Sequence, residues 1–183
     1  MQRFKIPTIS QVSEKNKEIL KGIQKTMGFL PNFYAYLAKN ETTLPVYRTL
    51  QKRKSTLSAK EREVVSLVVS QANDCSYCLS AHSLLGKING FSEAQLLEIR
   101  KTETSSNKKY DVLAKFTKSI VDNRGKASDQ ALENFFAVGY TESNMIDIVM
   151  IIGEVTISNY IHNLIKYEID FPLAPEIDLQ TTY

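Results

Sequence analysis

Apolar residues recur at intervals of three and four along most of this chain, which is the spacing of one face of an α-helix. The segment near 107–124 carries one such stripe: Leu113, Phe116, Ile120 and Val121. The segment near 141–166 carries another: Ile146, Val149, Ile152 and Gly153. No clear stretch alternates apolar and polar residues with the period of two that marks a half-buried strand. The pattern therefore predicts an all-α fold.

Small polar residues mark where these helices begin, and glycines mark where they end. Three pairs have the spacing of an N-cap and its partner: Ser13 with Asn16, Ser58 with Glu61, and Ser92 with Gln95. Thr141 is a further N-cap candidate, and the expected stops are Gly28, Gly90, Gly125 and Gly139. We expect about seven helices, because some of the following ranges should merge or fray: 10–27, 31–39, 43–55, 59–72, 75–89, 93–101, 108–124, 129–138 and 142–166.

The segment 59–72 needs its own argument, because valines favour strands as well as helices. A cap at Ser58 precedes it, and its valines have helical spacing: Val64, Val65, Val68 and Val69. We therefore predict a buried helix here.

The chain has 183 residues, 43% of them hydrophobic, which is enough to bury a sizeable core without disulfides. We expect one domain over 1–183, with an N-terminal helical part (1–57), a core region (58–166) and an extended tail (167–183). Pro172 and Pro175 exclude a continuous helix from the tail, which should lie across a neighbouring surface.

Charge and hydropathy exclude two classes of partner. The net charge of +3 is too small for a nucleic-acid footprint, and the basic cluster at 51–55 fits a solvated helix end. The N-terminus has no apolar run of signal-peptide length, and the most hydrophobic stretch is interrupted by Asp147 and Glu154. We expect a soluble, cytoplasmic protein that binds neither nucleic acid nor membrane.

The segment SQANDCSYCLSAHS, residues 70–83, contains both cysteines and one of the two histidines. Cys75 and Cys78 are too close in sequence to cross-link distant segments, so a structural disulfide is not expected. Three explanations compete: a redox-active dithiol, a metal site, or a coincidence within a helical core.

The position of the cysteines favours reactivity. If Asp74 or Asn73 caps the helix 75–89, both cysteines lie near its first turn, where free backbone N–H groups and the helix dipole stabilise a thiolate. His82 lies four residues after Cys78, on the same stripe, where its imidazole can accept the thiol proton.

Two glutamates begin the preceding helix, and capping separates their roles. Glu61 lies three residues after Ser58 and is expected to serve the cap. Glu63 lies two positions further on, where a partly buried carboxylate could exchange protons near neutral pH. An exposed helix glutamate is the alternative for Glu63.

The segment EVVSLVVSQANDCSYCLSAHS resembles the core motif of the alkylhydroperoxidase AhpD and carboxymuconolactone decarboxylase family. That motif has a glutamate, a Cys-x-x-Cys twelve residues later, and a histidine four residues after the second cysteine; Glu63, Cys75, Cys78 and His82 match it. The segments GFLPNFYAYLAKNETTLPVYRTL and NYIHNLIKYEIDFPLAP are also similar to the peroxidase-related branch, so the resemblance covers nearly the whole chain.

The resemblance implies an AhpD-like helical bundle that is an obligate oligomer, a trimer or hexamer, and a thiol peroxidase without cofactor or metal. Cys78 would be the peroxidatic cysteine that becomes a sulfenic acid, and Cys75 the resolving cysteine that condenses with it. Glu63 and His82 would relay protons. A dithiol, such as one on a lipoyl or thioredoxin-like carrier protein, would reduce the pair again.

One position departs from the family. The best-studied peroxidase branch has a second histidine just before the second cysteine, and this chain has Tyr77 there. The proton relay is therefore expected to be shorter or to pass through water. The decarboxylase branch generally lacks the cysteine pair, so lactone decarboxylation is not expected here.

Alternatives to a peroxidase stay open on the sequence. A zinc site could use Cys75, Cys78, His82 and the distant His162, although three donors along one helical stripe reach one ion poorly. A scaffold or redox-sensing module would oxidise without turnover. His162 itself is interpreted as a helix-packing or interface residue. Six aromatic residues could line a substrate pocket or belong to the core: Phe33, Tyr34, Tyr36, Tyr47, Phe135 and Phe136.

Overall fold

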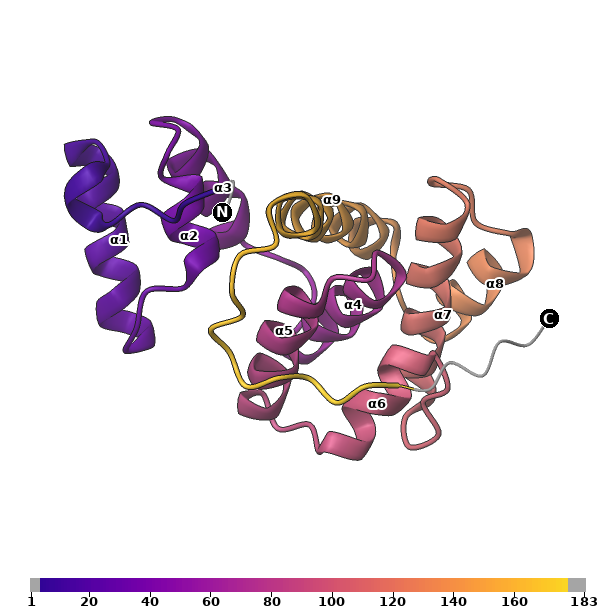
Figure 1. Ribbon diagram of the computed structural model, residues 1–183. Helices are drawn as coiled ribbons and strands as arrows, with labels where there is room; N and C mark the ends of the chain where they lie inside the picture. Colours follow the sequence, from indigo (N-terminus) through magenta and orange to yellow (C-terminus); the bar gives the residue numbers. More distant parts are fainter. Residues whose placement is uncertain (1–3, 178–183) are drawn as a thin grey trace.

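The computed structural model describes residues 4–177, and within this range the chain forms α-helices and one 3-10 turn but no strand (Figure 1). The turn Ile9–Gln11 is followed by α1 (Glu14–Met27), α2 (Asn32–Leu37), α3 (Thr43–Lys52), α4 (Ala59–Ala72), α5 (Ser76–Ile88), α6 (Glu93–Lys101), α7 (Lys108–Asp122), α8 (Asp129–Ala137) and α9 (Glu142–Ile165). The predicted all-α fold is confirmed. The expected merging of helices is wrong, because nine α-helices stay separate over the described residues.

The capping residues explain these bounds. Ser13 accepts a hydrogen bond from the backbone N–H of Asn16, so α1 begins at Glu14 and not at residue 10. Capping boxes start three further helices: Ser58 with Glu61 at α4, Ser92 with Gln95 at α6, and Thr141 with Asn144 at α9. Gly28 ends α1 with a φ of 80°, in the left-handed region that glycine adopts without strain.

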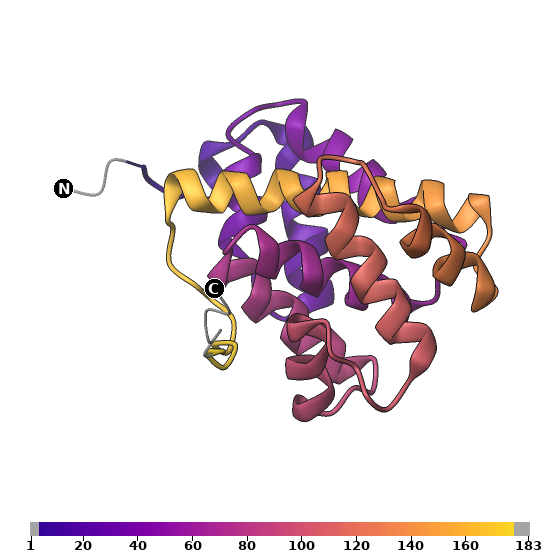
Figure 2. The same cartoon turned by 90° about the vertical axis from the view of Figure 1, so that its right-hand side faces the viewer.

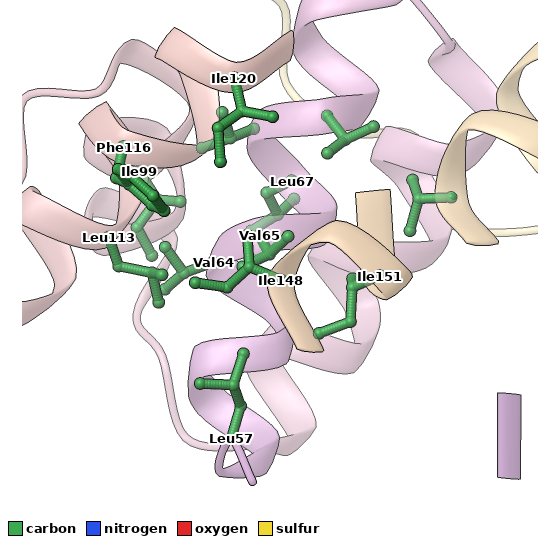
Figure 3. Close-up of a cluster of buried hydrophobic side chains, with 14 of the residues drawn as sticks. Leu57, Val64, Val65, Leu67, Ile99, Leu113, Phe116, Ile120, Ile148 and Ile151 are labelled. Carbon is green, nitrogen blue, oxygen red and sulfur yellow. The ribbon is translucent and has the colours of Figure 1, made fainter. Parts of the chain in front are cut away.

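The larger hydrophobic cluster surrounds α4, as Figure 3 shows. The valines of α4 are fully buried between α7 and α9, which confirms the helix predicted for 59–72. Phe116 of α7 stacks on Phe135 of α8 with a centroid distance of 4.2 Å. Helix α4 is therefore the central element against which α5, α6, α7 and α9 pack.

The buried face of α9 differs from the predicted one. Ile146 and Val149, expected in the core, are 64% and 52% exposed, whereas Ile148, Ile151 and Val155 are buried. Apolar residues lie on several sides of α9, so their spacing could not identify the inner face.

Helix α9 is the one described helix that is long and apolar enough, by length and composition, to cross a membrane. One of its charged residues, Glu154, is buried, and its Oε2 lies 3.2 Å from a guanidinium nitrogen of Arg53 and 3.5 Å from one of Arg62. Ile148 and Ile151 on the same helix lie in the α4-centred cluster. Helix α9 is therefore packed here as a core helix.

A second hydrophobic cluster joins α1, α2 and α3 to the start of α5 and to the segment after α9. Cys75, Tyr77 and Cys78 belong to this cluster. Figure 2 shows α9 running along the molecule, and its residues contact both clusters: Ile148 and Ile151 in the first, Ile161 and Ile165 in the second. The cysteines thus lie where the N-terminal helices meet α5 and the end of α9.

The described part of the tail is extended and lies across α5 and α6 (Figure 1). Arg100 of α6 donates a hydrogen bond to the carbonyl of Pro175 at 2.7 Å, and the N–H of Ala174 donates to Ser80 Oγ of α5 at 3.1 Å. The tail follows this course up to residue 177, and its last six residues lie outside the described range.

Candidate active site

Helix α5 begins at the dithiol. Its N-cap is Cys75, and not Asn73 or Asp74 as predicted, because Asn73 is the C-cap of α4 and Asp74 forms the turn with a φ of 48°. The Sγ atom of Cys75 accepts a hydrogen bond from the N–H of Cys78 at 3.4 Å. Both sulfur atoms therefore lie at the N-terminus of α5, where the helix dipole favours negative charge.

The two cysteines are free thiols with different surroundings. Both are buried, but Cys78 lines a cavity of about 80 Å³ together with His82, and Cys75 is not among the lining residues. A molecule in this cavity would therefore meet Cys78 first.

Five aromatic side chains line the cavity: Phe33, Tyr34, Tyr47, Tyr77 and Phe171. Three of the six aromatic residues that could have lined a pocket do so, and Tyr36, Phe135 and Phe136 do not. Phe135 belongs to the α4-centred cluster instead. Side chains of α2 and α3 line the cavity opposite those of α5, so the N-terminal helices help to shape the space in front of Cys78.

His82 and Glu63 form a close pair between α5 and α4. The Nδ1 atom of His82 lies 2.8 Å from Oε2 of Glu63. Burial lowers the pKa of His82, but the negative charge of Glu63 and this hydrogen bond outweigh burial and raise it overall. Since Glu63 holds Nδ1, Nε2 is the ring nitrogen left for chemistry at the cavity.

Glu61 has other contacts, as the capping argument expected. Its carboxylate accepts hydrogen bonds from Ser58 and, at 2.9 Å, from the hydroxyl of Tyr140, and Lys109 lies 3.1 Å away. Burial raises the pKa of Glu61, but the hydrogen bonds from Ser58 lower it overall. These contacts join α4 to the start of α7 and the segment before α9, and give Glu61 a structural role.

The pKa values of the two thiols are shifted in opposite directions. A hydrogen bond from Cys75 lowers the pKa of Cys78 to about 7, against the opposing effect of burial and with further help from the positive charge of His82. The same hydrogen bond, together with burial, raises the pKa of Cys75. Cys78 is therefore the cysteine that ionises first, with the Cys75 thiol as donor to its thiolate.

Helix α9 contributes two polar groups to the dithiol: Ser158, which the sequence analysis did not name, and His162, which it considered there only as a zinc donor. Ser158 Oγ lies 3.6 Å from Cys78 Sγ, and His162 Nδ1 lies 3.7 Å from Cys75 Sγ. His162 is only 6% exposed and packs against the rings of Tyr77 and Tyr167, so of its two interpretations helix packing fits the structure and an interface residue does not. Glu154, Ser158 and His162 follow one another at intervals of four and so lie on one face of α9. A line of polar residues on an otherwise apolar helix is the sequence signal from which Ser158 and His162 could have been assigned to the site.

Tyr77 is the residue that departs from the family motif, and its hydroxyl is directed at the backbone of α2 and not at the dithiol. Its hydroxyl oxygen accepts from the N–H of Phe33 at 3.3 Å, and burial raises the pKa of the phenol. Its ring stacks on that of His162, with centroids 5.2 Å apart. Tyr77 therefore helps to fix the orientation of His162.

The zinc hypothesis would need several donors to converge on one point. Within residues 4–177, no group of three or more His, Cys, Asp or Glu side chains is close enough to hold a metal ion. His82 faces Glu63, and His162 Nε2 lies 3.2 Å from the carbonyl oxygen of Tyr167.

Comparisons with known proteins identify the segment that carries the motif. Residues 43–106 match the carboxymuconolactone decarboxylase family. This segment includes Glu63, Cys75, Cys78 and His82, but it ends before α9. No curated protein sequence matches the chain significantly.

Solved structures match over nearly the whole chain. A peroxidase-related protein from Ralstonia eutropha JMP134, described as an alkylhydroperoxidase AhpD core, has 19% identity and a TM-score of 0.83, with 92% of each chain covered. A peroxidase-related protein from Silicibacter sp. TM1040 has 18% identity and a TM-score of 0.81, with 91% of each covered. The debrominase Bmp8 has 18% identity and a TM-score of 0.71, with 86% of this chain and 87% of that one covered. At these identities the likeness concerns the fold.

Proposed function

Because its segment 43–106 belongs to the carboxymuconolactone decarboxylase family and its fold is AhpD-like, we propose that this chain is a thiol peroxidase that reduces hydroperoxides through Cys78 and Cys75. One observation carries the proposal: Cys78, the thiol with the lowered pKa, lines the cavity beside His82, whereas Cys75 lies behind it.

The first step is nucleophilic attack by the Cys78 thiolate on the terminal oxygen of the hydroperoxide. The sulfur–oxygen bond forms, the oxygen–oxygen bond breaks, and the sulfur is oxidised to a sulfenic acid. The leaving alkoxide takes a proton from Nε2 of His82. Glu63 holds the other ring nitrogen at 2.8 Å and stabilises the protonated imidazole before that transfer.

In the second step Cys75 attacks the sulfur of the Cys78 sulfenic acid. A sulfur–sulfur bond forms and water leaves, so the pair becomes a disulfide and is protected from further oxidation. A dithiol then exchanges with the disulfide, restores both thiols and is itself oxidised. A dithiol on a lipoyl or thioredoxin-like carrier fits this step, and the reducing cytoplasm would keep the pair ready.

We also propose that the protein acts as a homo-oligomer, a trimer or hexamer. Large apolar side chains follow one outer face of α9 at helical spacing and are 41–76% exposed: Ile146, Val149, Met150, Ile157, Tyr160 and Leu164. The distance from the first to the last of them is about 27 Å at 1.5 Å per residue. An apolar face of this length suits burial against a second copy of the chain.

The test is a coupled assay in which hydroperoxide loss is followed with a dithiol reductant. The native protein should turn over tert-butyl hydroperoxide repeatedly, and Cys78→Ser should have no activity. Cys75→Ser should accumulate a sulfenic acid at Cys78, which dimedone labelling and mass spectrometry detect. One oxidation without turnover would instead indicate a redox sensor. Brominated pyrroles belong in the same assay, because Bmp8 of similar fold is a debrominase.

A further inference from the structure

We propose that His162 is a catalytic base for Cys75, taking the thiol proton as Cys75 attacks oxidised Cys78. The inference rests on the proposed dithiol chemistry and assigns a residue of α9, outside the family segment 43–106, to its second step. Its basis is the contact of 3.7 Å between His162 Nδ1 and Cys75 Sγ.

The protonation of the ring follows from its other contact. His162 Nε2 lies 3.2 Å from the carbonyl oxygen of Tyr167, and a carbonyl oxygen can only accept a hydrogen bond. Nε2 therefore carries the hydrogen. In the neutral ring Nδ1 then has a free lone pair, and it is this lone pair that faces the sulfur of Cys75.

The surroundings keep His162 neutral and fixed. Burial is the main cause that lowers the pKa of His162, and Lys166 acts in the same direction. The groups facing it are Cys75 and Tyr77 of α5 and the ring of Tyr167 after α9. The tyrosines are neutral near pH 7, since burial raises both of their pKa values. A neutral ring held in this way is a proton acceptor at working pH.

Cys75 needs such an acceptor only after Cys78 has reacted. In the reduced protein the Cys75 thiol donates to the Cys78 thiolate, and this contact raises the pKa of Cys75. Oxidation of Cys78 removes that negative charge. The Cys75 thiol then still has to lose its proton to become a nucleophile, and His162 Nδ1 is the nitrogen base in contact with it.

The step balances without another reagent. The Cys75–Cys78 sulfur–sulfur bond forms and the sulfur–oxygen bond of the sulfenic acid breaks. The hydroxide leaves as water with a proton from His82, whose ring regains a proton from solvent water after the first step. The Cys75 proton moves to His162. When the dithiol reductant later opens the disulfide, Cys75 leaves as a thiolate and takes this proton back.

The experiment separates this step from peroxide chemistry. Methyl methanethiosulfonate places a small S–CH₃ group on Cys78, and attack by Cys75 then releases methanethiol and forms the disulfide, which mass spectrometry follows with time. We expect this conversion to slow by about 100-fold in His162→Asn and His162→Gln, the lower end of the usual contribution of a general base. Asparagine can accept a hydrogen bond near the Nδ1 position and glutamine can donate near the Nε2 position, but neither takes up a proton.

The pH profile distinguishes a base from a packing residue. In the native protein the conversion rate should decrease at pH values below the lowered pKa of His162 and be constant at pH values above it. In both variants the rate should rise tenfold per pH unit, because it then follows the fraction of Cys75 present as thiolate. Glu61→Gln, with circular dichroism on all variants, is the control for folding. Equal conversion rates and equal pH profiles in native and variant proteins would overturn the role of His162. A native protein that forms the disulfide after this reagent but consumes no hydroperoxide would overturn the proposed function alone.

Discussion

The carboxylate of Glu63 on α4 lies 2.8 Å from Nδ1 of His82 on α5, so one side of the imidazole is fixed while the ring lines the cavity with Cys78. The contact joins the two helices that carry the family motif. It lowers the free-energy cost of a positive charge on His82 next to the thiolate, and this electrostatic coupling underlies the second and third predictions.

Alkylation of Cys78 should reveal its ionisation. The rate of reaction with iodoacetamide should rise with a midpoint near pH 7, because the hydrogen bond from Cys75 lowers the pKa of Cys78 to about 7. In Cys75→Ala the donor to the Cys78 thiolate is absent, and the midpoint should move towards the free thiol value of about 8.5. Stopped alkylation with peptide mass spectrometry measures both. A native midpoint at 8.5 would contradict an activated thiolate.

Glu63→Gln should reduce peroxide turnover by about 100-fold, because general acid–base groups contribute on this scale. Glutamine cannot stabilise the positive charge on His82. Glu61→Gln is the matched control on the same helix, and it should keep most of the activity, since glutamine also completes a capping box with Ser58. Equal losses of kcat in the two variants would show that the two carboxylates are not divided between these roles.

The same ion pair should make stability depend on pH. The pKa of His82 is raised in the folded protein, so its contribution is full below about pH 6.5, the unfolded value, and is lost as the pH rises through the folded value. Urea unfolding should therefore show that Cys78→Ser has a higher free energy of unfolding than Cys78→Ser with His82→Gln at pH 5.5. This difference should be smaller at pH 9. The Cys78→Ser background removes the thiolate. A difference that grew with pH would contradict the sign.

The size of the cavity should select small hydroperoxides. A volume of about 80 Å³ is room for only a few water-sized molecules. Hydrogen peroxide should therefore have a higher kcat/KM than cumene hydroperoxide. Tyr34→Ala removes a side chain that lines the cavity, and it should reduce the ratio of the two kcat/KM values about tenfold. Phe136→Ala, a residue that does not line the cavity, should leave the ratio unchanged. An unaltered ratio in Tyr34→Ala would mean that substrates reach Cys78 by another route.

A charge on the outer face of α9 should dissociate the oligomer. Ile157→Glu places a carboxylate in the middle of the exposed apolar face and should shift sedimentation velocity to the monomer. Ile88→Glu, on a residue that is 72% exposed at the end of α5, is the control and should leave the assembly intact. A native protein that sediments as a monomer would contradict the proposed self-association.

Local sequence signals predicted the helices well. Capping depends on residues three apart in the chain, so Ser58 with Glu61 and Ser92 with Gln95 could be identified without any tertiary structure. The same local reasoning could not find the cap of α5. Cys75 is the N-cap because the turn at Asp74 separates it from α4, and that backbone geometry has no clear pattern in the sequence.

Contacts between distant segments set the limit of the sequence analysis. The motif spacing brought Glu63 and His82 together on neighbouring helices, and the structure has them in contact. The interaction of His162 with Cys75 joins residues 87 positions apart, and no local period predicts it. The exposed face of α9 was missed for a related reason, since an apolar residue such as Ile146 fits a core and an outer surface equally well.

The dependence of the dithiol on α9 has a consequence for the nascent chain. Both cysteines, Glu63 and His82 leave the ribosome long before Ser158 and His162, which supply the contacts of 3.6 and 3.7 Å to the sulfurs. An incomplete polypeptide thus has its cysteines without the complete set of groups that tune them. Oxidative competence should emerge only after α9 has been synthesised and has packed against α5, which would protect unfinished molecules from premature oxidation.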